Sequence, residues 1–152
     1  MTLTKIFTGM ERGPEKIDDN FSSIDNTLSK LSFSDSQPYS GFVLSNGATW
    51  YGTGPGSLTK VELPGDYRLI TIEAVLKIAD FTATKGKTIL SIPQQFAPSH
   101  GVAVAMPSSG TMMARWSVSA AGTFAIENIT DEKATNVNTW YPIYMTYVTH
   151  NH

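Results

Sequence analysis

The sequence predicts a mainly β protein, an antiparallel β-sandwich or jelly-roll head that follows one short helix. From Gly41 onward, short runs with apolar residues at every second position alternate with turns that contain Gly and Pro. Ahead of Gly41, only the stretch 14–31 has its apolar residues at helical spacing. The 152 residues suffice for one domain with a substantial core and a short appendage.

The helix is expected to begin where residues 1–13, a separate N-terminal segment, end at Gly13-Pro14. Pro14 suits the first helical position, because the N–H that proline lacks would have no partner there. Glu15 and Asp18 favour the positive end of the helix dipole. These signals predict a helix over 14–31.

The apolar residues of this helix are separated by 4, 3, 4 and 3 positions, which is the d-a-d-a-d seam of a coiled coil. A helix that lies on its own core usually has a wider apolar stripe, whereas Asp18, Asn20, Asp25 and Thr27 flank this one. The narrow stripe favours a coiled-coil stem through which chains self-associate. Its members are Ile17, Phe21, Ile24, Leu28 and Leu31.

Residues 32–40 are rich in Ser and contain Pro38, which predicts a linker before the head domain, 41–152. Within the head, about eight or nine runs are typical of strands in an antiparallel sandwich. The runs are 42–46, 49–51, 58–63, 67–79, 88–92, 101–106, 112–120, 123–129 and 140–148.

Two strands show how the head should pack. In the longest, Ile70, Ile72, Ala74, Leu76 and Ile78 form a core face and the alternating face is more polar. The last strand is apolar on both faces, which indicates a place deep in the sandwich or against a neighbouring subunit. We assign to subunit contacts the face with Tyr141, Ile143, Met145 and Tyr147.

The charges exclude several classes of partner. The head carries seven Lys or Arg and seven Asp or Glu, so it offers no basic surface for nucleic acid.

No segment has the length and composition of a signal peptide or a membrane span, so we expect no membrane insertion. The chain has no cysteine, which excludes disulfides and thiol chemistry.

No motif in the sequence points to an enzyme, a cofactor or a metal. Gly86-Lys87-Thr88 ends like a phosphate-binding loop, but Phe81 occupies the position of the required first glycine. His150 and His152 have only His100 as a further histidine, too few ligands for a structural metal site. Asp66, Glu73 and Asp80 could converge in space as paired carboxylates, but nothing in their spacing favours it and solvated strand faces account for them.

Exposed aromatic residues are the remaining candidates for function. Trp50 and Tyr51 precede a glycine-rich turn, where flat amphipathic rings could support a sugar. Asp66, Arg68 and His100 lie in or beside other turns and could fix its hydroxyl groups. We expect Trp116 to be a core residue, since it is in phase with Met112 and Ala114.

Two parts of the chain resemble tail-fibre and baseplate proteins of phages and prophages of Gram-positive bacteria, lactobacilli in particular. The opening KIFTGMERGPEKIDDNF is similar to the N-termini of such proteins. The series SIPQQFAPSHGVAVAM, MMARWSVSAAGTFAI and TWYPIYMTYV resembles their β-sandwich head modules.

The resemblance implies a homotrimer in the phage tail of the virion, made in the cytoplasm of the bacterial host. The N-terminal segment would attach to other tail or baseplate proteins, and the heads would bind a host cell-wall saccharide. One alternative is a purely structural baseplate adaptor or capsid decoration protein. Another is a small glycan hydrolase, which would need two facing carboxylates.

Overall fold

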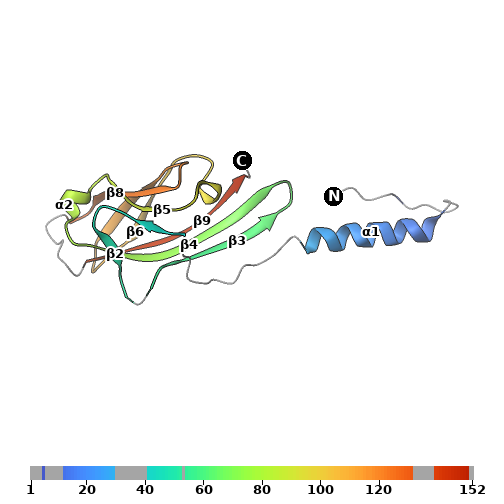
Figure 1. The fold of residues 1–152 in the computed structure, drawn as a ribbon, viewed down its shortest axis with the longest axis horizontal. Coiled ribbons are helices and arrows are strands. Elements are labelled where there is room, and N and C mark those ends of the chain that lie inside the picture. Colours follow the sequence, from blue (N-terminus) through green and yellow to red (C-terminus); the bar gives the residue numbers. More distant parts are fainter. Residues whose placement is uncertain (1–4, 6–11, 30–40, 53, 132–138, 151–152) are drawn as a thin grey trace.

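A computed structural model describes residues 5, 12–29, 41–52, 54–131 and 139–150. The head is formed by two antiparallel sheets that lie one over the other, with the helix beyond one end of them (Figure 1). Nine strands occur in these ranges, in agreement with the predicted runs. The linker 32–40 and most of the N-terminal segment 1–13 lie outside the described residues.

The first sheet has five strands in the order β1-β5-β8-β7-β6. Its register places small side chains opposite one another across neighbouring strands, as in the pairs Ala103 with Ser117 and Ser117 with Ala125. The strands are β1 (Val43–Leu44), β5 (Thr88–Ser91), β6 (Val102–Pro107), β7 (Met113–Val118) and β8 (Thr123–Ile129).

The second sheet is built around β4, which pairs along its whole length with β9 on one edge. On the other edge, β3 pairs with the first part of β4 and β2 with its last residues. The strands are β2 (Ala48–Trp50), β3 (Ser57–Leu63), β4 (Tyr67–Ile78) and β9 (Trp140–His150).

The core lies between the sheets and confirms the predicted face of β4, whose five core residues have exposed fractions between 0% and 6%. Trp116 of β7 is fully buried, also as predicted. Burying one such large side chain contributes about 1.5 to 3 kcal/mol. The fully buried centre comprises Ile70, Ile72, Leu76, Ile89, Leu90, Trp116, Phe124 and Tyr141.

Two short elements close the sandwich. Helix α2 (Phe81–Thr84) begins at Asp80, whose side chain accepts a hydrogen bond from the N–H of Ala83 at 2.9 Å. The 3₁₀ turn η1 (Gln94–Phe96) is fixed from β9, because Thr149 Oγ1 donates to the carbonyl of Ala97 at 2.6 Å. The hydroxyl of Tyr147 donates to the carbonyl of Phe96.

Strand β9 corrects one prediction. Tyr141, Ile143 and Met145 are 0%, 1% and 9% exposed and belong to the core of their own chain, so they do not form a subunit contact. Tyr147 packs against the same core. Hydrophobicity did not identify the inner face, because both faces of this strand are apolar. The outward face instead carries Tyr144 and Val148, which are 68% and 50% exposed.

Helix α1 (Gly13–Leu28) agrees with the predicted helix over the described residues, and none of its residues is buried. Ile17, Phe21 and Leu28 of the predicted seam are 43%, 66% and 57% exposed. Ile24 is partly exposed, and Leu31 lies outside the described residues. The single chain therefore does not cover this apolar stripe. Within the described ranges, no helix is long and apolar enough to cross a membrane.

Candidate functional site

Trp50 of the predicted binding residues is mainly a packing residue. It pairs with Leu76 across β2 and β4, and it is partly buried against the core. Its ring centroid lies 5.7 Å from that of Phe42, at an interplanar angle of 54°. Because this ring faces the sandwich interior, it does not offer an open platform to a ligand.

Asp66 and Arg68 lie at the opposite end of β4 from Trp50. Asp66 is exposed in the β3–β4 turn, where its φ is 62°. Arg68 is occupied by Glu62, with Nε 3.2 Å from a carboxylate oxygen, and by the carbonyl of Gln95. A strand of 12 residues spans roughly 40 Å, so these residues cannot share one small ligand with the β2 end.

His100 is exposed on the turn that precedes β6, in the other sheet. The structure therefore does not bring the five predicted residues together. Only Tyr51 has the exposure and surroundings that a ligand site needs.

Tyr51 borders a groove of about 460 Å³ at the end of β2. Its N–H donates to the carbonyl of Val75 at 2.9 Å, which fixes the backbone beside β4, and its side chain is 48% exposed. The Trp140 ring lies behind it, with centroids 6.3 Å apart and an interplanar angle of 40°. The lining residues are Tyr51, Gly54, Pro55, Gly56, Ser57, Glu73, Ala74 and Val75.

Glu73 supplies the charge of this groove. It lies directly between Ser57 of β3 and Tyr144 of β9 in the register of the sheet. Paired residues of an antiparallel sheet point to the same face, with Cβ atoms about 4.5 to 5.5 Å apart. A carboxylate, a hydroxyl and the exposed Tyr144 ring are thus neighbours on the outward face. We refer to Tyr51, Ser57, Glu73 and Tyr144 as the distal cluster.

Gly56 allows β3 to approach β4 at this point. A Cβ atom on Gly56 would overlap the carbonyl oxygen of Glu73 and would lie 2.6 Å from the Cβ of Ala74. Only glycine permits such an approach without displacement of the backbone. The glycine-rich stretch that the sequence marks as a turn therefore also shapes the groove wall.

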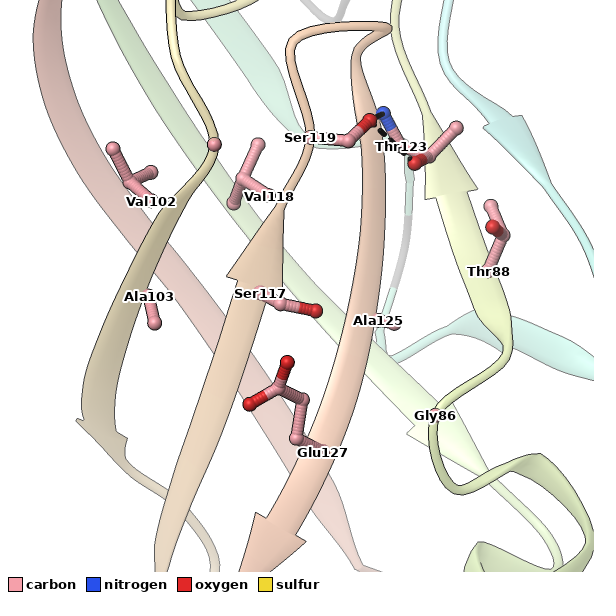
Figure 2. A pocket seen from close by; sticks show the side chains of 11 residues that line it. Gly86, Thr88, Val102, Ala103, Ser117, Val118, Ser119, Thr123, Ala125 and Glu127 are labelled. Carbon is pink, nitrogen blue, oxygen red and sulfur yellow. Dashed lines mark hydrogen bonds between the residues drawn. The ribbon is translucent and has the colours of Figure 1, made fainter.

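A second hollow, of about 470 Å³, lies on the outward face of the five-stranded sheet (Figure 2). Its floor is a row of small side chains in direct register, Ala103, Ser117, Ala125 and Thr88. Glu127 projects into one end of it, as Figure 2 shows. That carboxylate is paired with Arg115, whose Nε lies 3.2 Å away.

The two hollows differ in chemistry. No aromatic side chain is among the lining residues of the hollow in Figure 2, and its carboxylate already has a cationic partner. The distal cluster combines exposed rings with a carboxylate for which the described residues show no ion pair. The sequence marks Glu73 only as one of three carboxylates that could converge, and it does not mark Tyr144 as a binding residue. Strand register, rather than spacing along the chain, brings the two together.

Comparisons with known proteins find a likeness in structure but none in sequence family. No family model and no curated protein matches the chain. Among solved structures, the chain is similar to the receptor binding protein (gp15) of Listeria phage PSA, with 15% sequence identity and a TM-score of 0.49. The match covers 95% of this chain and 82% of that one.

Proposed function

We propose that this chain is a homotrimeric phage tail or baseplate protein that binds a host cell-surface saccharide through the distal cluster. The observation that carries the proposal is the grouping of Tyr51, Glu73 and Tyr144 on one outward sheet face. The resemblance of KIFTGMERGPEKIDDNF and of the head sequence to phage tail proteins supports the proposed location in a phage tail.

The chemistry of the cluster suits a sugar ring. An aromatic ring offers an apolar face to the C–H side of a pyranose, while polar neighbours bond to its hydroxyl groups. Glu73 can accept charge-assisted hydrogen bonds from two such hydroxyls, and Ser57 can donate or accept one more. The groove binds without turnover in this proposal, because Glu73 is the only carboxylate among its described lining residues.

The placement of the cluster fits adsorption. Figure 1 shows β2, where the groove begins, in the part of the head away from α1. If α1 forms the stem and the N-terminal segment joins other tail proteins, the groove points outward to the host wall. Three weak sites on one stem gain avidity of about 10²- to 10⁴-fold over a single site.

Two carboxylate variants test the site on the full chain. Binding of wild type, Glu73→Gln and Glu127→Gln would be measured against purified wall polysaccharides and wall fragments from Gram-positive hosts. We expect Glu73→Gln to weaken binding by at least about tenfold, the loss of one charge-assisted bond, and Glu127→Gln to leave it unchanged. Loss in Glu127→Gln alone would move the site to the hollow in Figure 2.

The purely structural alternative makes a different prediction. A baseplate adaptor or decoration protein would assemble as a trimer and bind none of these polymers. Release of reducing ends from the wall by wild type would instead favour the glycan hydrolase, which the proposal excludes.

A further inference from the structure

The end of the β3–β4–β9 sheet nearest α1 carries an apolar patch on its outward face. We infer that this patch packs against the same patches of the other two copies around the axis of the trimer, an inference that rests on the self-association proposed above. We call it the proximal patch; its members are Val61, Leu63, Tyr67, Leu69 and Val148.

Strand register forms the proximal patch. Val61, Leu69 and Val148 lie side by side in one row across the three strands, and Leu63, Tyr67 and His150 form the next row. Tyr67 and Val148 are 46% and 50% exposed, Leu63 and Leu69 are half-buried, and Val61, at 9%, lies beneath them as the floor of the patch. The ring of Tyr67 meets His150 edge to face, with centroids 4.9 Å apart.

A row of threonines separates the proximal patch from the distal cluster. Thr59, Thr71 and Thr146 are in direct register, and the hydroxyls of Thr71 and Thr146 are 3.0 Å apart. One sheet face thus has an apolar half near α1 and an aromatic, carboxylate-bearing half away from it. The two halves can serve different partners at the same time.

The charge pattern fits contact between identical surfaces. The rows of the proximal patch contain no Lys, Arg, Asp or Glu. Lys60, Glu62 and Arg68 alternate onto the inward face of the same strands, where both cations pair with Glu62. The exposed Asp66 lies in the turn at the outer edge of the patch. Copies of the chain can therefore bring these rows together without placing like charges in contact. A partner with a charged surface would instead need complementary charges, which the rows lack.

The position of the patch favours a second copy over an unrelated protein. Figure 1 shows the β3–β4 turn and the end of β9 on the side of the head that faces α1. Fourteen residues, 29–42, join α1 to β1 and span at most about 50 Å. Chains joined through the α1 stripe would hold their heads at an effective concentration on the order of millimolar.

Neither the proximal patch nor the α1 stripe is large enough to hold the oligomer together by itself. A stable interface buries about 800 Å² on each partner, more than a patch of five side chains provides. An isolated helix of 16 residues is marginal in water and needs its stripe covered. The α1 stripe and the proximal patch lie toward the same end of the head, so one association can cover both.

Thiol protection tests the inference, because the chain has no natural cysteine. Val148→Cys and, as a matched exposed valine on the other sheet, Val102→Cys would be labelled with a maleimide in the full chain. In the oligomer we expect Val148→Cys to react at least about tenfold more slowly than Val102→Cys, as burial of the sulfur requires. Adding Ile24→Asp, which breaks the stem, should bring the two rates together.

The outcomes separate this inference from the proposed function. Equal labelling of the two thiols in a proven oligomer would overturn the proximal patch and leave the trimeric adsorption protein standing. A wild-type chain that is monomeric at all concentrations would overturn both. If Val148→Cys itself impairs assembly while Val102→Cys does not, the patch is confirmed by that loss, and Tyr67→Cys serves as the second labelling site.

Discussion

The rings of Tyr51 and Trp140 lie 6.3 Å apart on the outward face of the second sheet, although 88 residues separate them in the sequence. Trp50, the immediate neighbour of Tyr51, points to the opposite face and packs on Phe42 and the core. Two consecutive aromatic residues therefore have different tasks. One stabilises the head and the other is available to a ligand.

Alanine variants should separate these tasks. Trp50→Ala should lower the free energy of unfolding by about 2 to 4 kcal/mol, since it removes a large, partly buried ring. Tyr51→Ala should change stability by less than about 1 kcal/mol and reduce saccharide binding. Urea unfolding and wall-polymer binding of both variants check this, and an unfolded Tyr51→Ala head would contradict it.

The fold could be predicted from the sequence further than the site. Alternation marks a face reliably where one side is polar, as it is beside Ile70 and Ile72 of β4. In β9 the alternating residues Ile143 and Tyr144 are both apolar, so the pattern cannot say which one faces the core. The register with β4 decides it, and register depends on pairing across the whole sheet.

The site depends on the same long-range pairing. Glu73 and Tyr144 are 71 positions apart and share no motif, yet they are direct cross-strand neighbours. The turn before β4 leads the sequence to predict Asp66 and Arg68 as binding residues, but this turn lies at the far end of a long strand, remote from Tyr51. Local signals find turns and faces, and only the strand order shows which of them meet.

The apolar stripe of α1 gives a second prediction, on the oligomeric state. Ile24→Asp places a charge in the α1 stripe and should reduce the mass in solution from three times the 16.5 kDa of one chain toward that of a single chain. Ser22→Asp adds the same charge off the stripe, on an exposed position, and should leave the mass unchanged. Light scattering over a range of concentrations measures both, and equal masses would contradict a seam.

The close approach of Gly56 to β4 predicts that a larger residue there would disturb the groove. Gly56→Ala should lower stability by about 1 to 3 kcal/mol and weaken saccharide binding, because the new methyl group overlaps the backbone of Glu73. Gly54→Ala has nothing within 4 Å of the added atom and serves as the control for stability, since Gly54 itself lines the groove. Similar free energies of unfolding for the two variants would contradict this view of the β3 approach.

Glu62 should make part of the stability depend on pH. A hydrogen bond from Lys60, whose Nζ lies 2.8 Å from Oε1, and then the charge of Arg68 hold the pKa of this carboxyl below its ordinary 4.5. A depressed pKa contributes stability above the ordinary value that is lost as the pH falls through the folded value.

Glu62→Gln should therefore be less stable than wild type at about pH 7, by a few tenths to about 1 kcal/mol, and equal to it at about pH 3. Urea midpoints at the two pH values measure the difference. Glu127→Gln, whose Arg115 pair is more exposed, should show a smaller effect at neutral pH. A gap for Glu62→Gln that persists in acid would rule out ionisation as its cause.

Tyr141 gives the last prediction, on the alkaline side. Its hydroxyl is buried and has no hydrogen-bond partner among the described residues, and its ring stacks on Phe81. A buried polar group without a partner costs about 1 to 3 kcal/mol, so Tyr141→Phe should raise the free energy of unfolding.

Burial also raises the pKa of Tyr141 from 10.0 to about 12. The unfolded chain therefore ionises first, and the wild type loses stability as the pH rises from 10.0 through about 12, a loss that phenylalanine does not have. The gain from Tyr141→Phe should consequently widen in that range, as unfolding curves at neutral and alkaline pH would show. Tyr147→Phe is the matched control, since it removes the hydrogen bond from the hydroxyl to the carbonyl of Phe96 and should destabilise the head by about 1 kcal/mol. If Tyr141→Phe were destabilised to the same degree, its hydroxyl would have a partner in the folded protein.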